Sequence, residues 1–135
     1  MRNTTMERRL SLDEVIERLA QTAFDSTIFS VYTNTKQLQQ RAVKGQYPHL
    51  VAVGNMSQRA EMVGMVETAE SLHNLEAAAR RWRSLDPLQA AIYLYVPRGY
   101  GPEARSVCLR ERIRISDFRH YWLDGETFHV QKCFA

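Results

Sequence analysis

The sequence predicts an α/β domain, at the border of the α+β class, in which a mixed β-sheet is flanked by helices. Helical periods alternate along the chain with short runs rich in β-branched and aromatic residues. The run AAIYLYV, residues 90–96, is apolar almost throughout, which is typical of a strand buried on both faces of a parallel or mixed sheet. A strand and then a helix precede it, and that order favours a right-handed parallel crossover.

Composition limits the domain count and the compartment. The chain has 135 residues, 44% hydrophobic and 24% charged, which is the balance of one globular domain with its own core. No apolar run approaches the roughly 20 residues of a membrane helix, and the N-terminus lacks the apolar segment of a signal peptide. We therefore expect a cytoplasmic protein with no membrane partner. Cys108 and Cys133 are predicted to be free thiols.

The N-terminal residues are expected to divide into a lead-in and a helix. Residues 1–10 are polar and rich in arginine, so we predict a flexible segment before a single domain at residues 11–135. Ser11 followed by Glu14 matches a capping box, and apolar side chains recur behind it at helical spacing to about Asp25. The run IFSVYT, residues 28–33, then predicts the first strand.

A β-hairpin is predicted to follow. Pro48 suits the start of a strand, where its missing amide does little harm, and LVAV at residues 50–53 forms that strand. Gly54-Asn55 begins a polar turn. The run EMVGMVE, residues 61–67, supplies the returning strand.

The second half of the chain predicts two helices around a central strand, and then short strands. Residues 71–85 carry apolar side chains on one helical face, and Asp86-Pro87 ends that helix before the strand at 90–96. The remaining expected elements are a loop at 97–102, a helix around 104–109, a short strand at 113–115, and a terminal hairpin of 121–123 and 127–130 about the Asp124-Gly125 turn.

Three segments, taken together, resemble a known nuclease superfamily. They are KGQYPHLVAVG (44–54), MVGMVETAES (62–71) and YLYVPRGYGPEA (93–104). In order and spacing they are similar to strands of the PD-(D/E)xK superfamily. The resemblance implies a restriction-endonuclease-like αβββαβ core over residues 12–115, to which the C-terminal hairpin is added. It also implies a divalent-metal site that cleaves DNA.

The residues at the implied catalytic positions depart from the superfamily pattern, in which Pro-Asp opens one strand and an acid and a lysine stand two residues apart on the next. Here the Pro-Asp position is Pro48-His49, and imidazole is a poor ligand for magnesium although it suits manganese or zinc. Glu67 is the candidate acid, which puts Ala69 at the lysine position. In the other alignment Glu67 takes the lysine position and Met65 replaces the acid. Glu67 and His49 are thus the candidate catalytic and metal-binding residues.

Two further sets of charged residues are candidates for the same function. Relocated carboxylates could complete the metal site, and the candidates are Glu70, Glu76 and Glu17. Arginine binds phosphate through its planar fork. The net charge of +3 permits nucleic acid as a partner, and the candidate phosphate-binding residues are Arg80, Arg81, Arg83 and Arg98.

Three hypotheses of function remain open at this point, and with them whether the protein is an enzyme. The first is a nuclease-fold protein with an eroded metal site that binds nucleic acid or a protein partner without efficient cleavage. The second is an active DNA endonuclease that uses magnesium or manganese and relocated carboxylates. The third is a structural or assembly module, including a homo-oligomer, whose sheet edge or aromatic terminal hairpin pairs with itself or with a partner.

Overall fold

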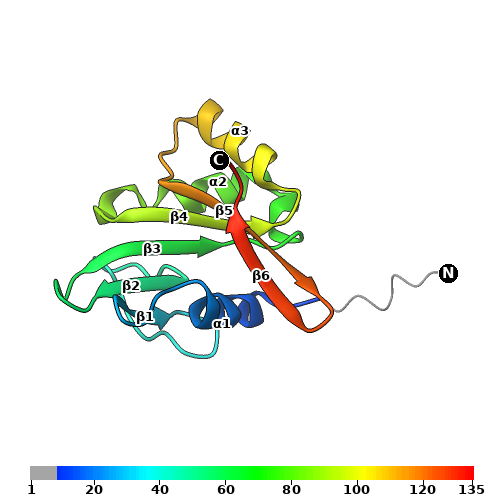
Figure 1. Cartoon of the computed structure of the whole chain (residues 1–135). Helices are drawn as coiled ribbons and strands as arrows, with labels where there is room; N and C mark the ends of the chain where they lie inside the picture. The colour runs from blue at the N-terminus through cyan, green and yellow to red at the C-terminus, as the bar shows by residue number, and fades with distance from the viewer. Residues whose placement is uncertain (1–8) are drawn as a thin grey trace.

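One six-stranded mixed sheet organises residues 9–135, the part of the chain that the computed structural model describes (Figure 1). The strands lie side by side in chain order. The β3–β4 and β4–β5 pairs are parallel, and the other three pairs are antiparallel. The strands are β1 (Phe29–Thr33), β2 (Leu50–Gly54), β3 (Ala60–Val66), β4 (Ala91–Pro97), β5 (Asp117–Asp124) and β6 (Thr127–Lys132).

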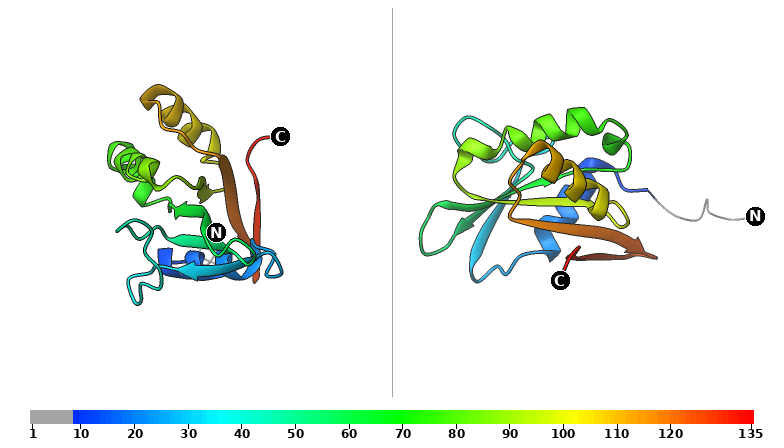
Figure 2. Two further views of the ribbon diagram at one scale, coloured as in Figure 1. Left: turned by 90° about the vertical axis from the view of Figure 1, so that its left-hand side faces the viewer. Right: turned by 90° about the horizontal axis from the view of Figure 1, so that it is seen from above.

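Helices cover both faces of this sheet. α2 (Leu75–Arg83) and α3 (Gly101–Glu111) pack with alternate residues of β3 and β4 in one core. α1 (Leu12–Thr22) packs on the other face in a second core that also includes Tyr121 of β5 and Val130 of β6. The left view of Figure 2 shows why α1 can contact both ends of the sheet. The sheet bends, so that β5 and β6 run across the direction of β1 and β2. The predicted mixed α/β class is confirmed.

The first helix forms as its capping signal predicts. The Ser11 hydroxyl accepts a hydrogen bond from the Glu14 backbone N–H (3.2 Å), and the Glu14 carboxylate accepts one from the Ser11 N–H (2.9 Å). Val15, Ile16 and Leu19 are fully buried beneath the sheet. The apolar spacing therefore predicted the buried face correctly, although the helix ends at Thr22, three residues earlier than expected.

The predicted helix at residues 71–85 is divided into two pieces, a 3-10 turn and α2. A short 3-10 turn, η2 (Ser71–His73), comes first, and a second, η3 (Asp86–Leu88), follows α2. Asn74 separates η2 from α2 because its backbone is non-helical (φ −114°) and its side chain accepts the N–H of Ala77 (3.0 Å). The 3-10 turn η2 brings Ser71 back toward the end of β3, where its hydroxyl donates to the Glu67 carboxylate (2.7 Å).

The predicted strand at 113–115 is wrong. Arg112 ends α3 in the left-handed conformation (φ 57°), and Ile113 then packs into the α2–α3 core outside any strand. The strand begins at Asp117 and continues without interruption into the first arm of the terminal hairpin. That hairpin is confirmed, with Trp122 opposite His129 and Gly125 at φ 61° in its turn.

Asn34 fixes the long connection between β1 and β2. Its side chain is buried, with the amide nitrogen donating to the carbonyls of Arg41 (2.7 Å) and Pro48 (2.6 Å) and the amide oxygen accepting the Arg41 N–H (3.0 Å). A buried amide with all these bonds satisfied holds its surroundings in one arrangement. The start of β2, where Pro48-His49 stands, is therefore fixed in place.

Two further expectations concern the N-terminal lead-in and membrane-spanning helices. Most of the expected lead-in, residues 1–8, lies outside the described residues. Within residues 9–135, none of the helices has the length and apolarity needed to span a membrane.

Candidate functional site

Glu67 stands directly after β3 and is buried, with 1% of its surface exposed. Its backbone N–H donates to the Tyr95 carbonyl (2.9 Å), which extends the β3–β4 ladder by one residue. Its own carbonyl accepts the hydroxyl of Tyr121 from β5 (2.9 Å). The backbone of Glu67 is therefore held by both strands on that side of β3.

The Glu67 carboxylate accepts four hydrogen bonds. Oε1 accepts from the Ser71 hydroxyl (2.7 Å) and from Nη2 of Arg81 (2.5 Å). Oε2 accepts from Nε1 of Trp82 (2.8 Å) and from Nε of Arg81 (3.3 Å). An ionised carboxylate offers about four lone-pair sites, so each oxygen is fully used. A metal ion could bind here only by displacing at least one of these donors.

These bonds make Glu67 a link between the sheet and α2. Arg81 approaches as a two-pronged fork, the geometry that best neutralises a carboxylate, and Trp82 beside it is 1% exposed. Of the two charged partners, only the Arg81 side chain reaches solvent, at 40% exposure. Burying a carboxylate is costly unless it is paired and hydrogen-bonded, and here both conditions are met.

His49 precedes β2 and lies beside the end of β3, where the Glu67 charge acts on its imidazole. Its Nδ1 accepts a hydrogen bond from the Val66 backbone N–H (2.8 Å). Burial lowers the pKa of His49, with the nearby Glu67 charge opposing that shift and Arg81 and Asp13 contributing smaller effects. The imidazole is therefore neutral with its proton on Nε2. Metal binding through Nδ1 would break the bond to Val66, so this ring is arranged as a structural acceptor.

We expect His49 to make stability depend on pH. Because its folded pKa lies below the ordinary 6.5, the unfolded chain takes up this proton first as pH falls. The contribution of neutral His49 to the free energy of unfolding is fully present above about pH 6.5 and is lost as the pH falls toward the folded pKa. In His49→Asn the amide oxygen can still accept the Val66 N–H without titrating there. The free energy of unfolding, measured with urea, should therefore fall less between about pH 7.5 and about pH 5.5 in His49→Asn than in the wild type.

The matched control for this measurement is His73→Asn, because His73 is exposed in η2. Its loss of stability between the two pH values should equal that of the wild type. If His49→Asn loses as much stability on acidification as the wild type does, the assignment of a neutral, half-buried His49 is wrong.

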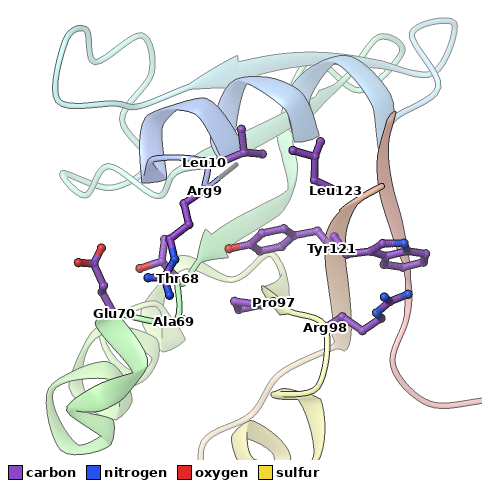
Figure 3. Close-up of a pocket in the computed structure, with 10 residues that line it drawn as sticks. Arg9, Leu10, Thr68, Ala69, Glu70, Pro97, Arg98, Tyr121 and Leu123 are labelled. Atoms are coloured by element: carbon purple, nitrogen blue, oxygen red, sulfur yellow. The ribbon is translucent and has the colours of Figure 1, made fainter. Parts of the chain in front are cut away.

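A pocket of about 340 Å³ opens beside this network, at the ends of β3 and β4 (Figure 3). Thr68, Ala69 and Glu70 line it from the β3–α2 connection, and Arg9 reaches in from the residues before α1. Tyr121 points from β5 toward the end of β3, where its hydroxyl meets the Glu67 carbonyl. Burial raises the pKa of Tyr121, so the hydroxyl stays protonated as a donor. The other lining residues are Leu10, Pro97, Arg98, Trp122 and Leu123.

The candidate relocated carboxylates do not gather at one place. Glu70 lines the pocket beside Glu67, whereas Glu17 lines a groove along α1 and Glu76 a groove between α2 and α3. Within residues 9–135, no group of three or more histidine, cysteine, aspartate or glutamate side chains is placed to hold a metal ion. The described residues thus bring only His49 and Glu67 together. Met65, which replaces the acid in the second alignment, is buried in the α2–α3 core.

The candidate phosphate-binding arginines also separate. Arg81 binds Glu67, and Arg83 donates to the carbonyl (2.8 Å) and carboxylate (3.3 Å) of Glu111 on α3. Arg80 lines the α2–α3 groove with Glu111. Arg98 stands apart from them, after β4, with its Cζ atom 4.5 Å from the centroid of the Trp122 ring. The four arginines therefore do not form one cationic surface.

Sequence reasoning missed the contribution of the terminal hairpin to the site. Tyr121 and Trp122 both line the pocket, and His129 stacks on Trp122 with ring centroids 4.9 Å apart. A signal was present: once Asp124-Gly125 is taken as the turn, strand alternation pairs Trp122 with a residue near His129. The direction in which this hairpin faces depends on the bend of the sheet, which no local pattern predicts.

Comparisons with known proteins do not assign the chain to a family. No protein-family model matches it, and neither a search of curated proteins nor a search of solved structures found a match.

Proposed function

We propose that this chain is a nucleic-acid-binding protein with a nuclease-like core in which the ancestral metal site no longer cleaves. The observation that carries the proposal is the Glu67 carboxylate, buried and bonded to Ser71, Arg81 and Trp82. A catalytic carboxylate must offer an oxygen to a metal ion, and this one offers none.

The topology supports a nuclease-like origin. The order α1, β1, β2, β3, α2, β4 is the αβββαβ order that the resemblance implies, with an antiparallel β1–β2–β3 meander and a parallel β4. Pro48-His49 opens β2 and Glu67 follows β3, so the two candidate positions meet at one end of the sheet. This is where the superfamily's paired motifs would meet.

The residues around Glu67 support loss of cleavage. If Glu67 is the acid, Ala69 stands where a lysine would be needed; in the other alignment the acid is replaced by Met65, which contributes to the core. Without that lysine, no cation two residues from Glu67 can stabilise charge developing on a phosphate. Among residues 9–135, the cation bound to Glu67 is Arg81, which comes from α2 and neutralises the carboxylate itself.

The pocket beside Glu67 supports an anionic ligand. Arg98 and Arg9 line it, and neither is within ion-pair distance of a carboxylate among the described residues. Such uncompensated arginines are suited to phosphate, and arginine also stacks on planar groups. Among the described residues that line the pocket, the one acid is Glu70, whose side chain is exposed.

The test is to measure binding and cleavage together on the purified full chain. We expect labelled single-stranded DNA, duplex DNA or RNA to be bound with an affinity that falls steeply with salt, because released counterions drive such binding. We expect no cleavage with magnesium or manganese. Cleavage that needs the metal and is lost in Glu67→Gln would show an active nuclease instead. If no nucleic acid binds at low salt, the binding half of the proposal fails, and light scattering would then test the assembly hypothesis.

A further inference from the structure

The face of β5 that carries Trp122 has an unusual row of planar and cationic side chains. His120 and Trp122 lie two residues apart on β5, and their rings contact edge to face at 5.5 Å. On the next strand His129 stacks on Trp122 at an interplanar angle of 14°. Arg98 lies over the same indole from the other side of β5 in the sheet. We call these four residues, Arg98, His120, Trp122 and His129, the β5 strip.

A second pair of the same kind lies further along β5. The Cζ atom of Arg105, on α3, is 4.5 Å from the centroid of Phe134, which packs edge to face on Phe118. Phe118 is four residues before Trp122, so it shares the same face of the strand, about 13 Å away. An arginine therefore lies over an aromatic ring toward each end of β5.

His129 and Arg98 cover the two faces of the Trp122 indole, so the planes that stay open to a ligand are the outer faces of His129 and Arg98. Arg98 and Arg105 are exposed, and His120, Trp122 and His129 are half-buried. No ion pair to Arg98 or Arg105 is present within residues 9–135, so their charge is uncompensated by nearby carboxylates. The large exposed hydrophobic side chains, which would suit a protein partner, lie elsewhere: Ile28, Leu38, Tyr47, Met56 and Leu109.

We infer that the β5 strip binds single-stranded nucleic acid, with unpaired bases stacking on the outer faces of His129 and Arg98 and with the Arg98 charge neutralising a phosphate. Base stacking on aromatic side chains and on arginine planes is the way in which sheet surfaces hold single strands. The bases of a duplex are already stacked on one another, so they cannot use such a row. The inference rests on the proposed function and names its ligand class and its surface.

Trp122 reports on this binding directly. The chain has two tryptophans, and Trp82 is 1% exposed and bonded to Glu67, so a base stacked on the strip should quench only the emission of Trp122. We expect oligothymidine or oligouridine to quench tryptophan emission, and a duplex of the same length to do so much less. Anisotropy of the labelled oligonucleotide gives the affinity in parallel.

Four variants of the full chain separate stacking from charge. Trp122→Leu should weaken binding about tenfold or more, whereas Trp122→Phe should keep most of the affinity and lose the quenching. Arg98→Gln should weaken binding and reduce the slope of log K against log salt by about 0.7, the share of one phosphate on a single strand. The control is Arg59→Gln, because Arg59 is exposed at the opposite end of β3 and should bind as the wild type does. Circular dichroism checks that each variant is folded.

The outcomes distinguish this inference from the proposed function. If nucleic acid binds but folded Trp122→Leu and Arg98→Gln bind as tightly as the wild type, the binding surface is elsewhere and the inference fails alone. Equal binding of duplex and single strand, with Trp122 emission unchanged, also overturns it. If no oligonucleotide binds and Trp122→Leu changes the oligomeric state, the strip is a protein interface, and both proposals fail.

Discussion

Replacing Glu67 with alanine should lower the free energy of unfolding by about 3 kcal/mol. Breaking a buried ion pair costs about 3–5 kcal/mol when the remaining partner stays buried. Here the Arg81 side chain is 40% exposed and can turn to water, which places the expected loss at the lower end. Trp82 is 1% exposed, and its unpaired N–H accounts for about 1–3 kcal/mol by itself. Urea unfolding followed by circular dichroism measures the change.

Two matched variants make the Glu67 result interpretable. Glu17→Ala removes an exposed glutamate from α1 and should change stability by less than about 0.5 kcal/mol. Glu67→Gln keeps the shape of the side chain and one acceptor oxygen, so it should lower the free energy of unfolding by less than Glu67→Ala does. A loss below about 1 kcal/mol for Glu67→Ala would contradict a structural role and would suit a carboxylate kept for catalysis.

Replacing Leu94 with alanine should lower the free energy of unfolding by about 2–5 kcal/mol. Leu94 is fully buried in β4, which has parallel neighbours on both sides and belongs to the core covered by α2 and α3. Removing its side chain loses apolar burial and leaves a cavity that the surrounding strands can fill only in part. Chemical unfolding with and without the substitution measures the loss.

The chain provides the same substitution in an exposed position as a control. Leu109 on α3 is 72% exposed, so Leu109→Ala should change stability by less than about 0.5 kcal/mol. If both leucine variants lost equal stability, the placement of β4 at the centre of the sheet would be wrong.

The predictions that succeeded depend on residues close together in the chain. The Ser11–Glu14 capping box starts α1, the apolar run at 90–96 is the central strand, and Asp124-Gly125 marks the terminal hairpin. Two boundaries were predicted wrongly, for different reasons. Asn74 interrupts the predicted helix at 71–85 through a local cap that the apolar spacing does not reveal. Distant packing decides the other boundary, because the strand begins only at Asp117, where pairing with β4 becomes possible.

For the candidate site, the sequence predicted which two positions lie close together and did not predict the role of their side chains. The resemblance placed His49 and Glu67 at neighbouring strand ends, and the structure brings them together through the Val66 N–H that His49 accepts. What each side chain does there was not predictable from its own surroundings in the sequence. The same glutamate could have been a ligand, a helix cap or an exposed acid.

The sequence by itself determined the periodic elements and their order, because caps, turns and apolar spacing act over a few neighbouring residues. Only the tertiary structure decided the state of Glu67. Its donors Arg81 and Trp82 come from α2, and the hydroxyl on its carbonyl comes from Tyr121 on β5, 54 residues away. A carboxylate is a metal ligand or a structural anchor according to which groups surround it, and those groups are assembled by the packing of the sheet and its helices.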